Sequence, residues 1–175
     1  CQSAVFIQCV GSRDTDRPYC SKVCCTHSVK SALKLKEANP DMDVYVIYRD
    51  IRTYGQRELL YKAARDKGVI FIRYTLDKKP VVEQRGDALL VMTRDHILGL
   101  PLEIRTDLLV LASAIEPREN SALAQLFKLT LNGDNFFMEA HAKLRPVDFA
   151  TDGMFLAGMA HYPKPVEESI AQAKA

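Results

Sequence analysis

The sequence predicts a three-layer α/β fold with a mainly parallel sheet and an added antiparallel meander. In the first half of the chain, short apolar runs alternate with helical patterns, which is typical of parallel crossover units. From residue 80 to residue 106, short strand-like runs are separated only by turns, which is typical of an antiparallel meander. We therefore expect a doubly wound parallel sheet followed by a smaller antiparallel one.

The first half is expected to contain three strands and two helices in alternation. The predicted strands are residues 3–10, 43–50 and 69–75, and the predicted helices are residues 21–40 and 55–68. The first helix is expected to begin at Ser21 or at the Pro18 turn and to end at Asn39–Pro40. Gly68 is the predicted stop of the second helix.

The second half changes character after Thr75. The predicted meander strands are residues 80–85, 87–95 and 100–106. The apolar run DLLVLASA at 107–114 is expected to return to the parallel sheet as a central strand. Beyond it we expect a helix at 120–129 capped by Asn120, an extended piece at 135–140, a strand at 153–160 and a last helix from Pro165.

Composition limits the class of protein. The chain has 175 residues, of which 47% are hydrophobic and 26% charged, and this suits one globular domain with a proper core. Its 24 basic and 22 acidic residues are interspersed, so we expect no nucleic-acid partner. No apolar run could span a bilayer and no signal peptide opens the chain, so we expect no membrane insertion and a cytoplasmic location. The chain starts at Cys1 without methionine, so we expect a piece of a longer protein.

Four of the five cysteines lie within CVGSRDTDRPYCSKVCC, residues 9–25. In a reducing compartment, clustered cysteines more often bind metal or do redox chemistry than form structural disulfides. The thiolates of Cys9, Cys20, Cys24 and Cys25 suit an iron–sulfur cluster. Zinc would need all four sulfurs about 3.8 Å apart, and adjacent helical cysteines meet that demand poorly. Redox or packing roles for some of these cysteines remain alternatives, and Cys1 has no assigned role.

The turn after the first predicted strand lacks a nucleotide fingerprint. Dinucleotide-binding domains carry G-x-G-x-x-G there, which lets backbone amides approach a pyrophosphate at the following helix. Here only Gly11 is present, and an Arg–Asp-rich insert with Pro18 occupies the place of the pyrophosphate. We therefore expect no NAD(P) binding at this turn.

Several motifs resemble the A subunit of heterodisulfide reductase, an iron–sulfur flavoprotein of methanogens with relatives in other anaerobes. They are FIQCVGSRD, PYCSKVCC, VYVIYRDIRTYG, LRPV and GMFLAGMAHYPKPVEESIAQAKA. The order of elements also resembles the Rossmann-like, FAD/NAD(P)-binding two-domain flavoproteins such as thioredoxin reductase. In those proteins the pyridine-nucleotide domain is inserted into the FAD domain.

The resemblance implies an oxidoreductase module that relays electrons between FAD and iron–sulfur clusters on partner subunits. It implies that Cys9, Cys20, Cys24 and Cys25 ligate a [4Fe–4S] cluster. It divides the chain into an inserted nucleotide-domain-like module at 1–147 and a segment at 148–175 that returns to the FAD domain. The isolated piece is expected to be inactive. The alternatives are a pyridine-nucleotide-dependent disulfide-reductase-type domain and a zinc-stabilised interaction module.

The resemblance also implies flavin contacts near the end of the chain. In the related flavoproteins the last helix meets the flavin pyrimidine, and backbone amides at a helix N-terminus are suited to such a ligand. The candidate contacts are Gly158, Met159, Pro165, Val166, Glu167 and Gln172. Met159 stands where the related proteins commonly have an aspartate. FAD is expected only in the full-length protein, because its main pyrophosphate loop would lie outside this chain.

Other conspicuous residues receive structural interpretations. The four histidines lack the spacing of a metal site, so we expect surface or capping roles for them. Glu167 and Glu168 are expected to favour a helix N-terminus. Residues 48–54 follow the second predicted strand and are expected to support domain packing or the cysteine loop. No catalytic residue is predicted.

Overall fold

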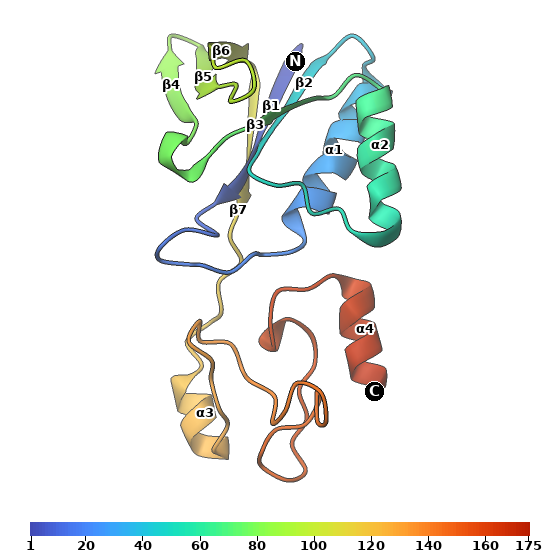
Figure 1. Ribbon diagram of the computed structural model, residues 1–175, viewed down its shortest axis with the longest axis vertical. Helices are drawn as coiled ribbons and strands as arrows, with labels where there is room; N and C mark the ends of the chain where they lie inside the picture. The colour runs from blue at the N-terminus through green and yellow to red at the C-terminus, as the bar shows by residue number, and fades with distance from the viewer.

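The computed structural model describes all 175 residues, and they form two lobes (Figure 1). The upper lobe contains both sheets and the first two helices, whereas the lower lobe contains the last two helices and the loops between them (Figure 1). None of the helices is long and apolar enough to cross a bilayer.

A four-stranded parallel sheet forms the middle of the upper lobe. Its strands are β1 (Ser3–Val10), β2 (Asp43–Tyr48), β3 (Ile70–Arg73) and β7 (Leu108–Ser113). They pair in the order β3-β2-β1-β7, and every pairing is parallel. The strand β7 returns to the sheet as expected, but it lies at the edge and not in the centre, because no strand pairs with its outer side.

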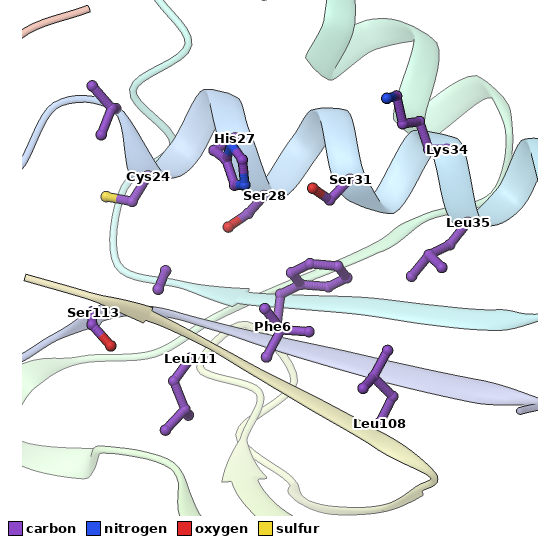
Figure 2. Close-up of a pocket in the computed structure, with 13 residues that line it drawn as sticks. Phe6, Cys24, His27, Ser28, Ser31, Lys34, Leu35, Leu108, Leu111 and Ser113 are labelled. Carbon is purple, nitrogen blue, oxygen red and sulfur yellow. The ribbon is translucent and has the colours of Figure 1, made fainter.

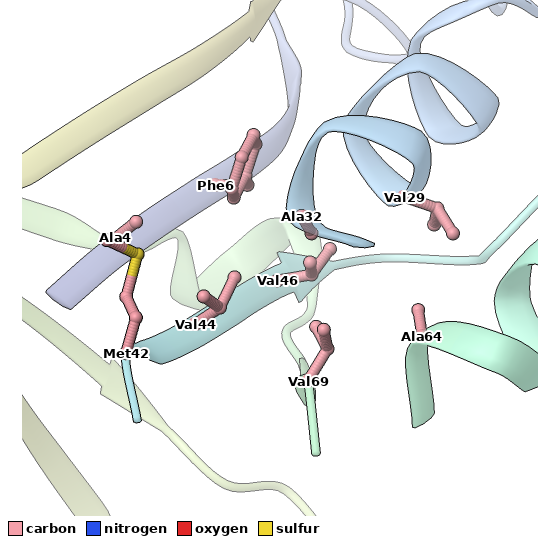
Figure 3. Close-up of a cluster of buried hydrophobic side chains, with 9 residues drawn as sticks. All are labelled: Ala4, Phe6, Val29, Ala32, Met42, Val44, Val46, Ala64 and Val69. Atoms are coloured by element: carbon pink, nitrogen blue, oxygen red, sulfur yellow. The ribbon is translucent and has the colours of Figure 1, made fainter. Parts of the chain in front are cut away.

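Two helices cover one face of this sheet (Figure 1). They are α1 (Cys24–Ala38) and α2 (Glu58–Asp66), and a 3-10 turn at Gly55–Arg57 precedes α2. Alternate residues of β1, Ala4 and Phe6, point to this layer and join a buried cluster with Val29 of α1 and Val46 of β2 (Figure 3). This cluster anchors α1 against β1 and β2.

The other face is covered by an antiparallel sheet and not by helices. This meander is formed by β4 (Val81–Arg85), β5 (Ala88–Arg94) and β6 (Pro101–Thr106), after a 3-10 turn at Leu76–Lys78. Val5 and Ile7 of β1 point to this side and pack with Val91 and Ile104. The α/β fold with a parallel sheet and a meander is thus confirmed, but the doubly wound arrangement is wrong, because the meander takes the place of a second helical layer.

The lower lobe has little regular structure. It contains α3 (Ser121–Phe127), a 3-10 turn at Gly158–Ala160 and α4 (Val166–Lys174). A small core joins Ala124, Phe137, Phe149 and Leu156. The predicted strand at 153–160 is wrong, since only one isolated bridge, between Asp148 and Phe155, forms there. The extended piece at 135–140 also makes a single bridge, between Leu131 and Phe137.

Candidate functional site

Cys9 occupies a strained position at the carboxyl end of β1. Its φ is +61°, which is uncommon for a residue other than glycine. The pairing register between β1 and β7 shifts between Ile7 and Val10, so an irregularity in the strand accommodates this conformation. The side chain is buried. Strain of this kind often marks a functional position.

The loop from Gly11 to Val23 folds back over this sheet edge. Tyr19 is buried in it, packs edge-to-face against Phe136, and donates a hydrogen bond of 2.8 Å to the carbonyl of Ile115. The Ser21 hydroxyl accepts a hydrogen bond of 2.9 Å from the Ile115 N–H. Contrary to the prediction, Ser21 therefore fastens the loop to the chain after β7 and does not begin α1.

The other three cysteines follow at the end of this loop. Cys24 and Cys25 are buried in the first turn of α1, as the sequence predicts, whereas Cys20 is half-buried. The sulfur of Cys20 accepts the Lys22 N–H at 3.3 Å, and the Cys25 thiol donates to the Asp50 carbonyl at 3.7 Å. The structure therefore brings all four cysteines of the loop to the carboxyl edge of the parallel sheet. Cys1 lies apart and is exposed.

The thiols of this region differ in acidity. Pairing with Cys24 lowers the pKa of Cys25 to about 7, and Arg52 acts in the same direction. The same pairing and burial raise the pKa of Cys24. Burial raises the pKa of Cys9, and the neighbouring Arg13 opposes that increase. Cys25 therefore loses its proton more readily than Cys9 or Cys24.

Basic side chains support the loop from the end of β2. Arg13 forms an ion pair with Asp50 at 2.6 Å between Nη2 and Oδ2. Arg49 donates a hydrogen bond to the Arg13 carbonyl. These contacts confirm that residues 48–54 support the cysteine loop. Arg13 was not singled out from the sequence, and its nearness to Cys9 in the chain was the available signal.

The donor set and its surroundings fit an iron–sulfur group. All five cysteines are free thiols, so none is consumed by a disulfide. The side chain of Gln8, next to Cys9, is fully buried, and neither its amide nitrogen nor its oxygen has a hydrogen-bond partner. Buried amides are rarely left unpaired, so this orphan marks a place where a polar group fits. No three His, Cys, Asp or Glu side chains converge closely enough to hold a single metal ion.

The predicted flavin contacts gather around the start of α4. Pro165 is the N-cap residue of α4, as predicted. The first hydrogen bond of the helix runs from the Ser169 N–H to the Pro165 carbonyl, so the preceding amides have no intrahelical acceptor. Gly158, with φ at +70°, donates its N–H to the Gln172 side chain at 3.1 Å. These free amides and this glycine are compatible with close approach of a polar ring.

The remaining predicted contacts are exposed or paired. Met159 and Val166 expose 45% and 73% of their surface, so both are available to a further part of the protein or to a ligand. Glu167 forms an ion pair with Arg57, and Glu168 binds Lys22 and Tyr54. Both glutamates lie in the first turn of α4, as expected.

A polar network behind Gly158 was missed in the sequence. The Nε2 of His161 lies 2.8 Å from Glu139, and its Nδ1 lies 3.0 Å from the Lys164 ammonium and 2.9 Å from the Gln172 amide. The surface or capping role expected for His161 is therefore wrong. For His141 that role is confirmed, because its Nδ1 accepts two backbone N–H groups.

A separate apolar cavity of about 480 Å³ lies between α1 and the edge strand β7 (Figure 2). Phe6, Leu35, Leu108 and Leu111 line it, and Cys24 lies at one end (Figure 2). Polar side chains, among them Ser28, Ser31 and Ser113, complete its lining (Figure 2).

The chain is similar to three archaeal proteins over nearly its whole length. It is 41% identical to the iron–sulfur A subunit of the CoB–CoM heterodisulfide reductase of Methanocaldococcus jannaschii, with 97% of this chain and 26% of that protein aligned. It is 43% identical to the A subunit of the H₂:CoB–CoM heterodisulfide, ferredoxin reductase of Methanothermobacter marburgensis, with 96% and 26% aligned. It is 40% identical to a protein of Archaeoglobus profundus that is named as like the heterodisulfide reductase A subunit, with 98% and 24% aligned. The chain thus spans about a quarter of the length of these relatives.

Solved structures share the fold at low sequence identity. The flavoprotein disulfide reductase RclA of Escherichia coli, as its Cu(II) complex, matches with a TM-score of 0.61 at 12% identity, covering 99% of this chain and 34% of that chain. The T. acidophilum thioredoxin reductase also matches with a TM-score of 0.61 at 12% identity, covering 97% and 48%. No family model matches the chain. The likeness therefore confirms the fold of the FAD/NAD(P)-binding disulfide reductases.

Proposed function

Because the chain belongs to the family of heterodisulfide reductase A subunits, as a segment of about a quarter of a member's length, we propose that it is the electron-transfer module of such a protein. Cys9, Cys20, Cys24 and Cys25 would hold a [4Fe–4S] cluster. The observation that carries the proposal is the gathering of these four free thiols at one sheet edge. A cluster supplies one-electron steps and FAD supplies the link to two-electron chemistry.

The residues of this chain would place and stabilise the cluster. The first turn of α1 directs free backbone amides and the positive end of the helix dipole towards Cys24 and Cys25, which favours thiolates and a net-negative cluster. The loop from Gly11 to Val23 closes over the site through its own buried side chains, Tyr19 and Ser21.

We propose that the segment around α4 contacts FAD in the full-length protein, through Gly158, Met159, Pro165, Val166, Glu167 and Gln172. The support is the glycine in the left-handed region together with the free amides at the start of α4. The division into 1–147 and 148–175 belongs to this proposal. The loop that would hold the cluster and the helix that would contact FAD touch each other through Lys22 and Glu168.

The wider setting follows from the family. Other subunits of a heterodisulfide reductase-like complex are the proposed partners, in the cytoplasm of an anaerobe. A pyridine-nucleotide-dependent domain is disfavoured by the missing glycine fingerprint. A zinc module is disfavoured by the adjacent Cys24 and Cys25 in one helical turn, because neighbouring helical side chains point in different directions. We expect the isolated piece to have no catalytic activity, because an electron relay works only together with the FAD and the partner clusters between which it passes electrons.

Anaerobic purification of the full-length protein tests the cluster. Iron, acid-labile sulfide and the electron paramagnetic resonance (EPR) signal after reduction would be measured for the wild type and for Cys20→Ala, Cys24→Ala and Cys1→Ala. We expect the first two variants to lose about four iron and four sulfide per chain, and Cys1→Ala to lose none, since Cys1 is exposed and outside the loop. Full iron and sulfide in both loop variants would remove these residues from the ligand set.

A further inference from the structure

Arg13 is held in one conformation by its backbone. Its φ is +58°, in the left-handed region that non-glycine residues rarely adopt. The Arg13 N–H donates to the Tyr19 carbonyl at 3.1 Å, and the Arg13 carbonyl accepts a hydrogen bond from the Arg49 guanidinium. Such a conformation persists only where surrounding contacts determine it, and it is common near functional groups.

The side chain of Arg13 is also held in place, by burial and by an ion pair with Asp50. This side chain is only 15% exposed. Nη2 lies 2.6 Å from Oδ2 of Asp50, and Nη1 lies 4.0 Å from the sulfur of Cys9, the outer limit of a hydrogen bond to sulfur. Asp50 also meets Arg73 at 3.4 Å, so two arginines share one carboxylate and the group keeps a net positive charge.

The positive charge of Arg13 lies close enough to the Cys9 sulfur to attract negative charge on a cluster that this sulfur ligates. Cluster potentials depend on net charge and on hydrogen bonds to the ligand sulfurs. Reduction adds one negative charge to a cluster, and a neighbouring cation stabilises the reduced form more than the oxidised one. Burial strengthens this effect, since water screens the interaction less.

We propose that Arg13 is a positioning residue that raises the reduction potential of the cluster, acting through the sulfur of Cys9. This inference rests on the proposed function, because it requires a cluster at Cys9. Asp50 orients the guanidinium, and the left-handed backbone turns the side chain back towards β1. Arg13 thereby sets how easily the cluster accepts an electron, without itself touching the iron.

The test is a redox titration of the full-length protein, followed by EPR under anaerobic conditions. The signal of this cluster is identified as the one that Cys20→Ala lacks. Arg13→Gln removes the charge, and Arg13→Lys retains it with a changed geometry. Arg17→Gln is the matched control, because Arg17 lies in the same loop and pairs with Glu116 away from the sulfurs. Iron and sulfide content are measured for every variant.

We expect Arg13→Gln to keep its iron and to show a lower midpoint potential than the wild type, with Arg13→Lys in between and Arg17→Gln unchanged. Equal potentials in Arg13→Gln and Arg17→Gln, with full iron, would overturn the inference and leave the proposed function intact. Loss of iron in both Arg13 variants would make Arg13 an assembly residue and also overturn it. If Cys20→Ala loses no signal, the proposed function fails, and this inference fails with it.

Discussion

The ammonium of Lys22 lies 2.8 Å from the carboxylate of Glu168, across 146 residues of sequence. Lys22 stands between Cys20 and Cys24, and Glu168 stands in the first turn of α4. The Tyr54 hydroxyl donates to the same glutamate, and Lys22 and Arg57 lie over the Tyr54 ring. The cysteine loop is thereby tied to the helix that we propose as the flavin contact.

Removing this tie is expected to loosen α4. Glu168→Gln should speed amide hydrogen exchange in α4 by about 1.4-fold to fivefold, because a partly exposed ion pair contributes roughly 0.2–1 kcal/mol. Glu37→Gln, which removes an exposed pair with Lys67, is the control and should leave α4 unchanged. Mass-spectrometric hydrogen exchange measures both. Identical exchange in α4 for the two variants would show that the contact does not hold the helix.

Loss of the cluster is expected to separate flavin binding from electron transfer. In the full-length protein, Cys20→Ala should keep its FAD but slow the exchange of electrons between flavin and the partner clusters, since Cys20 lies outside the proposed flavin contacts. Flavin content and anaerobic stopped-flow spectroscopy measure the two properties. An unchanged rate in a variant without this cluster would leave the cluster a structural role only.

FAD binding is expected to require that the flavin lie close to the backbone of Gly158. Gly158→Val should lower the flavin content of the full-length protein, because a side chain at φ +70° is strained and moves the N–H away from Gln172. Gly153→Val carries the same kind of strain at φ +78°, with open space around its Cβ, and is the matched control. Flavin absorbance per chain is the measurement. An equal loss in both variants would indicate general strain and remove Gly158 from the contacts.

The packed loop is expected to exclude NAD(P)H. Titration of the full-length protein with NADH or NADPH should show no low-micromolar binding at this turn. The turn lacks the glycine fingerprint, and the loop after it is packed through the buried side chains of Tyr19 and Ser21. Equilibrium dialysis measures the binding. A complex with the nucleotide lying between β1 and α1 would contradict the prediction.

The contact between the two sheets is expected to stabilise the upper lobe. Ile47→Ala should lower the free energy of unfolding by about 2–5 kcal/mol, because this side chain is fully buried between the parallel sheet and the meander. Ile97→Ala, at 82% exposure in the β5–β6 turn, should change it by less than about 0.5 kcal/mol. Urea unfolding followed by circular dichroism compares the two. Equal effects would place the stabilising core elsewhere.

Local patterns in the sequence were enough for the order of the elements and for the cysteine loop. The alternation of apolar runs predicted β1, α1, β2, α2 and β3, because the period of side-chain burial is a property of each segment. The helical pattern that follows the loop also predicted that Cys24 and Cys25 lie in the first turn of α1.

Contacts between segments that are distant in the sequence could not be predicted from local patterns. Local periodicity does not show which segments become neighbours in space. Three features depend on such neighbours: the edge position of β7, the meander over the second sheet face, and the absence of the predicted strand at 153–160. The same holds for Arg13 with Asp50, and for Lys22 with Glu168. An isolated charged side chain is well solvated by water, so the local sequence does not show which opposite charge it will pair with in the folded protein. Only tertiary packing therefore determines that Arg13 pairs with Asp50, that Lys22 pairs with Glu168, and that the cysteine loop packs on the chain after β7.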